Sequence, residues 1–298
     1  MLKDYFMLLR LPNLFTVPSN ILAGYFSVVS YFPVNSSNLA LLVTSSVLLY
    51  ISGIIFNDYF DIEIDQKERP FRPLPSGKVA KQTAFLAAII SMVAANILAF
   101  MVSTTGFIVA IILSVIILGY DYKLKQTFAG PACMGTARTL NVFLGASAIL
   151  PATFSLSNSL AQERLAILSI SEFLYVLSIS FLSRMEIGPA RSPHTVTIIF
   201  IVIFGVITII IAASLVSIFQ IDLVVNLLLF MGVIIVTFKL TISELSSTNI
   251  QRAIKILVLS IIILDSIFIS GTTGVYYGMA TLLLIIPSIL LARKLYVT

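Results

Sequence analysis

The chain has 298 residues, of which 59% are hydrophobic and only 10% are charged. A water-soluble domain carries about 25% charged residues, and a disordered chain combines low hydrophobicity with high charge, so the composition excludes both classes and indicates an integral membrane protein. One cysteine and one histidine exclude a disulfide framework and a zinc site built from nitrogen and sulfur ligands.

Apolar runs recur along the whole chain. A helix that crosses about 30 Å of hydrocarbon needs roughly 20 mostly apolar residues. Runs of this kind occur at 12–33, 39–56, 82–102, 104–120, 131–152, 164–183, 195–217, 221–240, 253–271 and 274–291. The first run lies behind Arg10 and Pro12 and lacks a small-residue cleavage site, so we expect a retained span rather than a signal peptide. The runs predict a single all-α transmembrane domain over residues 1–298.

The basic residues are distributed unevenly between the connections. If the runs alternate across the membrane, 16 of the 18 Lys and Arg residues fall on one side. Arg164 falls on the opposite side, and Arg138 lies inside a span. Loops rich in Lys and Arg stay cytoplasmic, so we expect a multi-pass protein whose charged loops and termini are cytoplasmic. The net charge of +5 then indicates contact with anionic membrane lipid, and no nucleic acid partner is expected.

The connection 57–81 is the longest and most charged, and it holds five of the 13 acidic residues. Asn57, Asp61 and Asp65 are spaced four apart, so on a continuing helix they share one face, which Asp58 borders. Oxygen ligands on one face suit magnesium, which is bound through carboxylates, water and substrate phosphate. The segment therefore predicts an Mg²⁺ site formed by Asn57, Asp58, Asp61 and Asp65. A solvated helix end with compensating charges is the alternative interpretation.

A basic, proline-rich stretch follows the acidic residues directly. Arg69 and Arg72 lie among Pro70, Pro73 and Pro75, which stop the helix and hold the loop in a defined path. The planar guanidinium group matches phosphate oxygens well. Carboxylates for a metal followed by arginines for phosphate predict a diphosphate site.

This combination resembles the UbiA family of intramembrane prenyltransferases. The resemblance rests on the pattern Asn57-Asp58-x-x-Asp61-x-x-x-Asp65 and on the stretch Arg69-Pro70-x-Arg72-Pro73-Leu74-Pro75-Ser76-Gly77. Further similarity lies in Arg10-Leu11-Pro12-Asn13, in Tyr120-Asp121-Tyr122-Lys123-Leu124-Lys125, and in Arg138 with Asn141. The similarity covers about residue 8 to about residue 200, and beyond that only the hydrophobicity matches.

The resemblance implies a fold and an activity. The family fold is a bundle of nine transmembrane helices around a central cavity that opens to lipid, whereas the apolar runs favour ten. The implied activity is the Mg²⁺-dependent transfer of a prenyl group from an allylic prenyl diphosphate to a small, lipophilic or aromatic acceptor. The residues implied to bind substrate are Asn13, Arg69, Arg72, Lys123, Lys125, Arg138 and Asn141, and those implied in catalysis are Asp61, Asp65, Arg184 and Glu186.

For three of these basic residues the sequence also allows an interpretation other than substrate binding. An arginine inside a span is costly and normally faces a partner or a wet cavity, so Arg138 is expected to line the cavity together with Asn141, three residues further on. Pairing of Arg138 with a backbone carbonyl or with Glu172 is the competing interpretation. Of Lys123 and Lys125, only one is expected to point inward.

The second acidic motif of the family is reduced here. The corresponding stretch, 183–195, contains Glu186 as its only acidic residue, with Arg184 and Arg191 nearby. In one outcome Arg184 replaces a missing ion and the protein remains a transferase. In the other, the protein binds an isoprenoid without ionising it, as a non-catalytic component of a membrane export or assembly system. The divergent EboC-like branch of the family is similar in this respect.

Two other classes fit the sequence poorly. A CDP-alcohol phosphotransferase would need an Asp-Gly pair and an Ala-Arg pair between its aspartates, and the segment 57–65 has neither. A secondary transporter would show two related halves with Gly- or Pro-broken spans, and no such repeat is visible.

Overall fold

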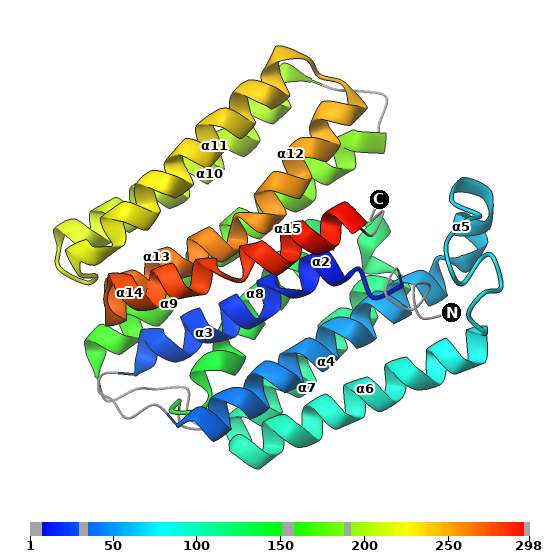
Figure 1. Ribbon diagram of the computed structural model, residues 1–298, viewed down its shortest axis with the longest axis horizontal. Helices are drawn as coiled ribbons and strands as arrows, with labels where there is room; N and C mark the ends of the chain where they lie inside the picture. Colours follow the sequence, from blue (N-terminus) through cyan, green and yellow to red (C-terminus); the bar gives the residue numbers. More distant parts are fainter. Residues whose placement is uncertain (1–7, 30–34, 151–157, 188–191, 295–298) are drawn as a thin grey trace.

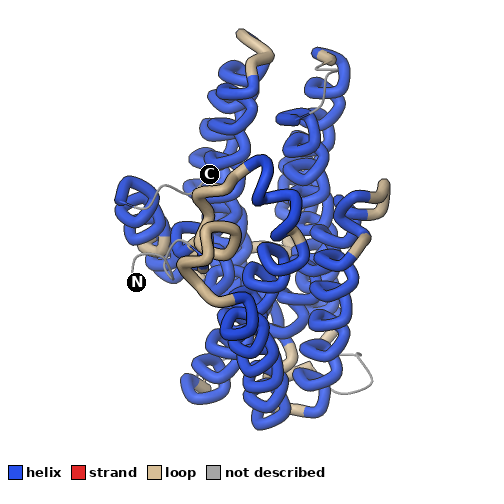
Figure 2. The backbone as a smooth tube through the Cα atoms, turned by 90° about the vertical axis from the view of Figure 1, so that its right-hand side faces the viewer, coloured by secondary structure: helices blue, strands red, loops and turns tan. Residues whose placement is uncertain are grey.

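The computed structural model describes residues 8–29, 35–150, 158–187 and 192–294, and these residues contain helices and no β-strand. The long helices run side by side, with α4, α6 and α7 on one edge and α10 and α11 on the opposite edge (Figure 1). Figure 2 shows the same helices from the side, joined by loops. In chain order the elements are α2 (Leu11–Leu14), α3 (Thr16–Val28), α4 (Ser36–Phe60), α5 (Ile62–Glu68), α6 (Lys81–Val102), α7 (Thr104–Tyr122), η1 (Leu124–Gln126), α8 (Gly130–Ala146), α9 (Ser159–Ile187), α10 (Pro193–Leu215), η2 (Ile221–Leu223), α11 (Val224–Ser243), α12 (Ser247–Leu259), α13 (Ile261–Thr273), α14 (Val275–Leu282) and α15 (Ile285–Lys294).

Eight segments of the described chain are long and apolar enough to cross a membrane. Five are single helices, and the other three are formed by η2 with α11, by α12 with α13, and by α14 with α15. The helices α3 and α8 are shorter, with 13 and 17 residues. Each of the ten expected runs contains a helix, so the prediction of an all-α, multi-pass membrane protein is confirmed.

Helices α3 and α8 lie between two apolar clusters, one built mainly on α9–α13 and the other on α4, α6 and α7. The two helices approach closely because glycines lie where they cross. A Cβ atom on Gly24 would come within 2.1 Å of the Val142 carbonyl oxygen, and one on Gly145 within 2.3 Å of the Ile21 carbonyl oxygen. Small residues let membrane helices pack backbone to backbone, so the glycines of α3 and α8 allow the two helices to pack closely at the centre of the bundle.

The helix that carries the acidic residues breaks at Asp61. Asp61 lies between the two helices, as the C-cap of α4 and the N-cap of α5, with φ −89° and ψ 5°. Its amide still donates to the Asn57 carbonyl at 3.0 Å, and the Asp65 amide donates to the Asp61 carbonyl at 2.8 Å. The backbone hydrogen bonding therefore continues across a change of direction, which places α5 at an angle to α4 (Figure 1).

The last helix returns to the first, since the Ser288 hydroxyl of α15 donates to the Pro12 carbonyl of α2 at 2.6 Å. A recess of about 260 Å³ opens between α8 and α9, and it is lined by Thr136, Thr139, Ser169, Ile170, Phe173 and Leu174. The central cavity implied by the family resemblance stays a prediction.

Candidate functional site

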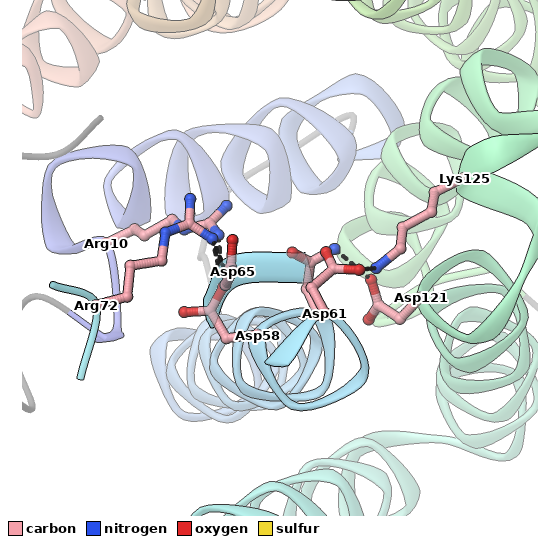
Figure 3. A network of polar contacts seen from close by, with 8 residues as sticks. Arg10, Asp58, Asp61, Asp65, Arg72, Asp121 and Lys125 are labelled. Carbon is pink, nitrogen blue, oxygen red and sulfur yellow. Dashed lines mark hydrogen bonds and ion pairs between the residues drawn. The ribbon is translucent and has the colours of Figure 1, made fainter. Parts of the chain in front are cut away.

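Four polar residues occur in succession at the junction of α4 and α5. Asn57 and Asp58 belong to the last turn of α4, Asp61 lies at the break, and Asp65 lies on α5. Asp58 and Asp65 are buried, with 3% and 4% of their surfaces exposed, whereas Asp61 is half-buried. We call Asn57, Asp58, Asp61 and Asp65 the acidic ladder. Figure 3 shows that its carboxylates face in two directions.

Two arginines bind one side of the ladder. Arg10 directly precedes α2, and its Nη2 donates to Asp58 Oδ1 at 2.7 Å. Arg72 Nη1, from the loop after α5, donates to Asp65 Oδ2 at 2.7 Å and lies 3.5 Å from Asp58 Oδ1. Arg72 therefore joins the two buried carboxylates, and the proline-rich loop folds back over the helix that precedes it.

The other side of the ladder meets the end of α7. Lys125 Nζ, from η1, lies 2.5 Å from Asp61 Oδ1. Asn57 Nδ2 donates to Asp121 Oδ1 at 3.1 Å, and Asp121, near the end of α7, is itself buried. Of the two lysines considered from the sequence, Lys125 reaches the ladder and Lys123 is exposed.

The site as a whole contains four carboxylates, on Asp58, Asp61, Asp65 and Asp121, against three cations, on Arg10, Arg72 and Lys125. Each ladder carboxylate has a cationic partner. The described residues contain no group of three or more Asp, Glu, His or Cys side chains placed to hold a metal ion. The break at Asp61 explains this arrangement, because it directs Asp61 and Asp65 into different ion pairs although their spacing in sequence is regular.

The donors still fit the predicted ion by their chemistry. Every candidate ligand offers a carboxylate or amide oxygen, which is the donor class that Mg²⁺ and other hard cations prefer. Binding would require the carboxylates to release Arg72 and Lys125, and it would leave those cations free to meet an anionic ligand. The assignment of Asn57, Asp58, Asp61 and Asp65 to a metal stays a prediction.

The remaining residues predicted to bind substrate lie in different surroundings. Asn13 is half-buried in α2, where its backbone carbonyl accepts from the Thr16 hydroxyl at 2.8 Å. Arg69 is half-buried at the end of α5. The roles of Asn13 and Arg69 in binding substrate stay predictions.

Arg138 and Asn141 tie α8 to its neighbours. Arg138 donates to the Thr16 carbonyl at 3.1 Å and to the Thr16 hydroxyl at 2.7 Å. The competing interpretation, a backbone carbonyl as the partner of Arg138, therefore describes the contact in the structure. Asn141 accepts from the Ser46 hydroxyl and donates to the Val17 carbonyl at 3.4 Å. Both side chains join helices, and their predicted contact with substrate stays a prediction.

The end of α9, where the reduced second motif lies, is tied to two other elements. Arg184 Nη2 donates to the Lys125 carbonyl at 3.1 Å and also to the Thr127 carbonyl. A Cβ atom on Gly130 would lie 2.6 Å from that nitrogen, so the glycine makes room for the guanidinium group. Glu186 Oε1 accepts from Gln251 Nε2 of α12 at 2.6 Å. In this structure the guanidinium group of Arg184 binds the loop that carries Lys125, and the expectation that Arg184 neutralises a departing diphosphate stays a prediction.

Sequence reasoning assigned no role to three residues that complete this region. Arg10 lies 48 positions from its partner Asp58, and Asp121 lies 64 positions from Asn57. Gly130 matters only through its contact with Arg184. A signal was available for Asp121, which is a single acidic residue at the end of an apolar run and lies within a motif quoted for the family resemblance.

The chain matches one family model, the UbiA prenyltransferase family, over residues 17–241. Among curated proteins it is similar to digeranylgeranylglyceryl phosphate synthase from Saccharolobus solfataricus, with 28% identity over 48% of this chain and 51% of that protein. It is also similar to the synthase of the same name from Sulfurisphaera tokodaii, with 29% identity over 62% of this chain and 64% of that protein. The matched region thus spans about half to two thirds of the length of these relatives.

Solved structures agree on the fold. A UbiA homolog from Aeropyrum pernix K1 superposes with a TM-score of 0.69 at 16% identity, over 86% of this chain and 96% of that chain. A digeranylgeranylglyceryl phosphate synthase gives 0.68 at 20% identity, over 92% and 99%. A UbiA homolog from Archaeoglobus fulgidus, solved with DMAPP and Mg²⁺, gives 0.65 at 13% identity, over 94% and 99%.

Proposed function

The chain belongs to the UbiA prenyltransferase family, and from this premise we propose that it transfers a prenyl group from an allylic prenyl diphosphate to a lipophilic acceptor inside the membrane. One observation carries the proposal: the acidic ladder and the cations Arg10, Arg72 and Lys125 meet at one place, although they come from four separate parts of the chain.

We propose that the ladder holds a divalent cation, Mg²⁺, through Asp61 and Asp65 with help from Asn57 and Asp58. When bound, the ion supplies Lewis-acid stabilisation of the diphosphate leaving group. The donor chemistry supports this assignment, and so does the A. fulgidus homolog that was solved with Mg²⁺ and DMAPP.

The basic residues have the second task in this proposal. Arg72 and Lys125 now neutralise carboxylates, and they would move to phosphate oxygens once the carboxylates engage the metal. Arginine is suited to this exchange because its planar fork matches carboxylate and phosphate equally well. The exchange keeps every charge partnered, since each cation leaves one anion for another. Because Asp58 and Asp65 are buried, direct contacts between opposite charges are stronger there than they would be in water.

The reaction that follows breaks the bond between the allylic carbon and the ester oxygen that joins it to the diphosphate, and the diphosphate keeps the electron pair. An acceptor hydroxyl oxygen then bonds to the allylic carbon, and its proton passes to the released pyrophosphate.

For the acceptor we propose a lipid-like glyceryl phosphate rather than an aromatic ring. The support is the name shared by the curated relatives, digeranylgeranylglyceryl phosphate synthase, whose product carries two geranylgeranyl groups on glyceryl phosphate. We further propose that the site faces the cytoplasm, because the loops that build it lie on the side expected to receive 16 of the 18 Lys and Arg residues.

A non-catalytic isoprenoid-binding role is the second candidate, and one observation favours it. Glu186, which accepts a hydrogen bond from Gln251, is the only acidic residue of the second motif, so that motif offers a ligand one carboxylate at most. A protein with a single acidic motif could hold an isoprenoid diphosphate without ionising it.

The test uses purified protein in lipid with Mg²⁺, labelled allylic diphosphates of increasing chain length, and a prenylated glyceryl phosphate as acceptor. We expect release of pyrophosphate that requires both Mg²⁺ and Asp61. The matched control is Glu63→Gln, which removes an exposed acid from α5 and should leave release unchanged. Binding of the diphosphates without release would favour the second candidate, and absence of both would reject each role.

A further inference from the structure

Two carboxyl groups meet in the interior of the bundle, apart from the acidic ladder. Glu172 belongs to α9 and Asp265 to α13, and both have 0% of their surface exposed. The two carboxyl groups lie close enough to act on each other electrostatically, although the residues are far apart in sequence. Both helices belong to segments long enough to cross a membrane, so this contact lies where water is scarce.

The two carboxyl groups differ in their other partners. Asp265 accepts from the Ser19 hydroxyl at 2.7 Å and from the Asn20 amide at 3.2 Å, so both of its oxygens have donors on α3. Neither oxygen of Glu172 receives a hydrogen bond from the part of the chain that the structure describes. Asp265 therefore has the donors that an ionised carboxylate needs, and Glu172 lacks them.

The charges around the two carboxyl groups also favour a state in which only one of them is ionised. Arg138 of α8 acts on both carboxyl groups, and its guanidinium group donates to the Thr16 carbonyl one helical turn before Ser19. The single hydroxyl hydrogen of Ser19 has two acceptors in reach, Asp265 at 2.7 Å and the Thr16 carbonyl at 3.1 Å, and the shorter contact is to Asp265. Tyr175, the other titratable group beside Glu172, turns its hydroxyl to the Leu257 carbonyl and to Ser260. One cation balances one carboxylate, which leaves the second carboxyl group to be neutral.

We propose that Glu172 and Asp265 form a proton-binding site that holds one proton between them, with Glu172 as the donor and Asp265 as the ionised acceptor. Two ionised carboxylates in contact would repel each other in surroundings that cannot solvate them, and one shared proton removes that repulsion while supplying the missing hydrogen bond. The site is separate from the proposed transfer chemistry, and it joins α3, α9 and α13 through a polar contact inside the membrane.

Infrared spectroscopy of the purified protein in lipid tests this proposal. A protonated carboxyl group gives a C=O stretching band that moves when H₂O is replaced by D₂O. We expect such a band in the unmodified protein and its loss in Glu172→Gln, which keeps the size of the side chain and offers an N–H to Asp265. Glu163→Gln removes an exposed acid from the same helix, and Asp121→Asn removes a buried acid at the other site, so both variants should keep the band.

A second measurement avoids any effect of substitution on folding. Unmodified protein labelled with ¹³C at the side-chain carboxyl of glutamate should show the band shifted, and protein labelled at aspartate should not. Absence of the band, its survival in Glu172→Gln, or a shift with aspartate label alone would overturn the proposal. None of these results depends on prenyl transfer, so the site can fail while the proposed function stands.

Discussion

The junction of α4 and α5 and the end of α9 correspond to the two acidic motifs of the family, and their charges are satisfied differently. At the junction, carboxylates are paired with side-chain cations that can leave for phosphate. At the end of α9, Arg184 binds two backbone carbonyls, and the Gln251 amide is among the partners of Glu186. In the proposed function the ion pairs of the first region exchange partners with a ligand, whereas the Arg184 contacts of the second region connect α9 to the loop that carries Lys125.

The largest effect should follow from removing a ladder carboxylate. Asp61→Ala and Asp65→Ala each delete a proposed metal ligand, and metal stabilisation of a leaving group is worth several kcal/mol, so we expect turnover to fall by about 100-fold or more. Mg²⁺-dependent binding of an allylic diphosphate should fall with it, measured by equilibrium binding in nanodiscs. Unchanged affinity in both variants, with Glu63→Gln as the control, would contradict the proposed metal site.

Arg72 offers the next largest effect. Arg72 contacts Asp65 at 2.7 Å and lies 3.5 Å from Asp58, and lysine cannot reproduce this two-sided contact. In the proposed function Arg72 moves to phosphate oxygens, which lysine cannot bind through a planar fork, and losing a buried contact between charged groups typically costs about 2 kcal/mol or more, so Arg72→Lys should weaken diphosphate binding roughly 30-fold. Arg252→Lys, an exposed change on α12, provides the control. Equal affinities for both variants would show that Arg72 holds only the loop.

These two predictions concern residues that the sequence could identify. The regular spacing of Asn57, Asp61 and Asp65 and the proline-rich arginines that follow form one continuous pattern, so the ladder and Arg72 were predictable from the chain. The helices were predictable for a similar reason, because each span is a local apolar run. The break at Asp61 was not predictable, since the backbone hydrogen bonds continue through it and only the axis changes.

The partners at the end of α9 could not be derived in the same way. A backbone carbonyl has no signature in sequence, so nothing in the segment around Arg184 indicates that it binds the carbonyls of Lys125 and Thr127. The contact of Glu172 with Asp265 likewise depends on how α9 and α13 are placed by other helices. Resemblance to a family predicts the residues that meet a shared ligand, and it does not predict those that only support them.

A smaller effect is expected at Glu186, where the two candidate functions diverge. Glu186→Gln keeps the size of the side chain and removes its charge, and hydrogen bonds to charged groups contribute about 1.5–3 kcal/mol. In a transferase we expect turnover to fall roughly tenfold or more with little change in diphosphate affinity. In an isoprenoid carrier only binding can change. Pyrophosphate release and equilibrium binding, measured on the same preparation with Glu244→Gln as the control, separate these outcomes.

The smallest effect should come from the glycine that makes room for Arg184. Gly130→Ala leaves every charge unchanged, but its methyl group would displace the guanidinium from the Lys125 carbonyl. A single hydrogen bond contributes about 0.5–1.5 kcal/mol net, so both Gly130→Ala and Arg184→Lys should weaken diphosphate binding roughly two- to tenfold. Gly205→Ala on α10, where the added atom meets open space, is the control.

A double-mutant cycle decides how Arg184 acts. If Arg184 works by positioning Lys125, then Gly130→Ala should cost nothing further in a Lys125→Met background, because the residue being positioned is gone. If Arg184 instead acts on the diphosphate through its own charge, the Arg184→Lys variant should bind the diphosphate normally. In that case the losses of binding free energy caused by Gly130→Ala and by Lys125→Met should add in the double variant. The first result would show that the end of α9 positions Lys125 beside the ladder. The second would show that the end of α9 contacts the diphosphate directly.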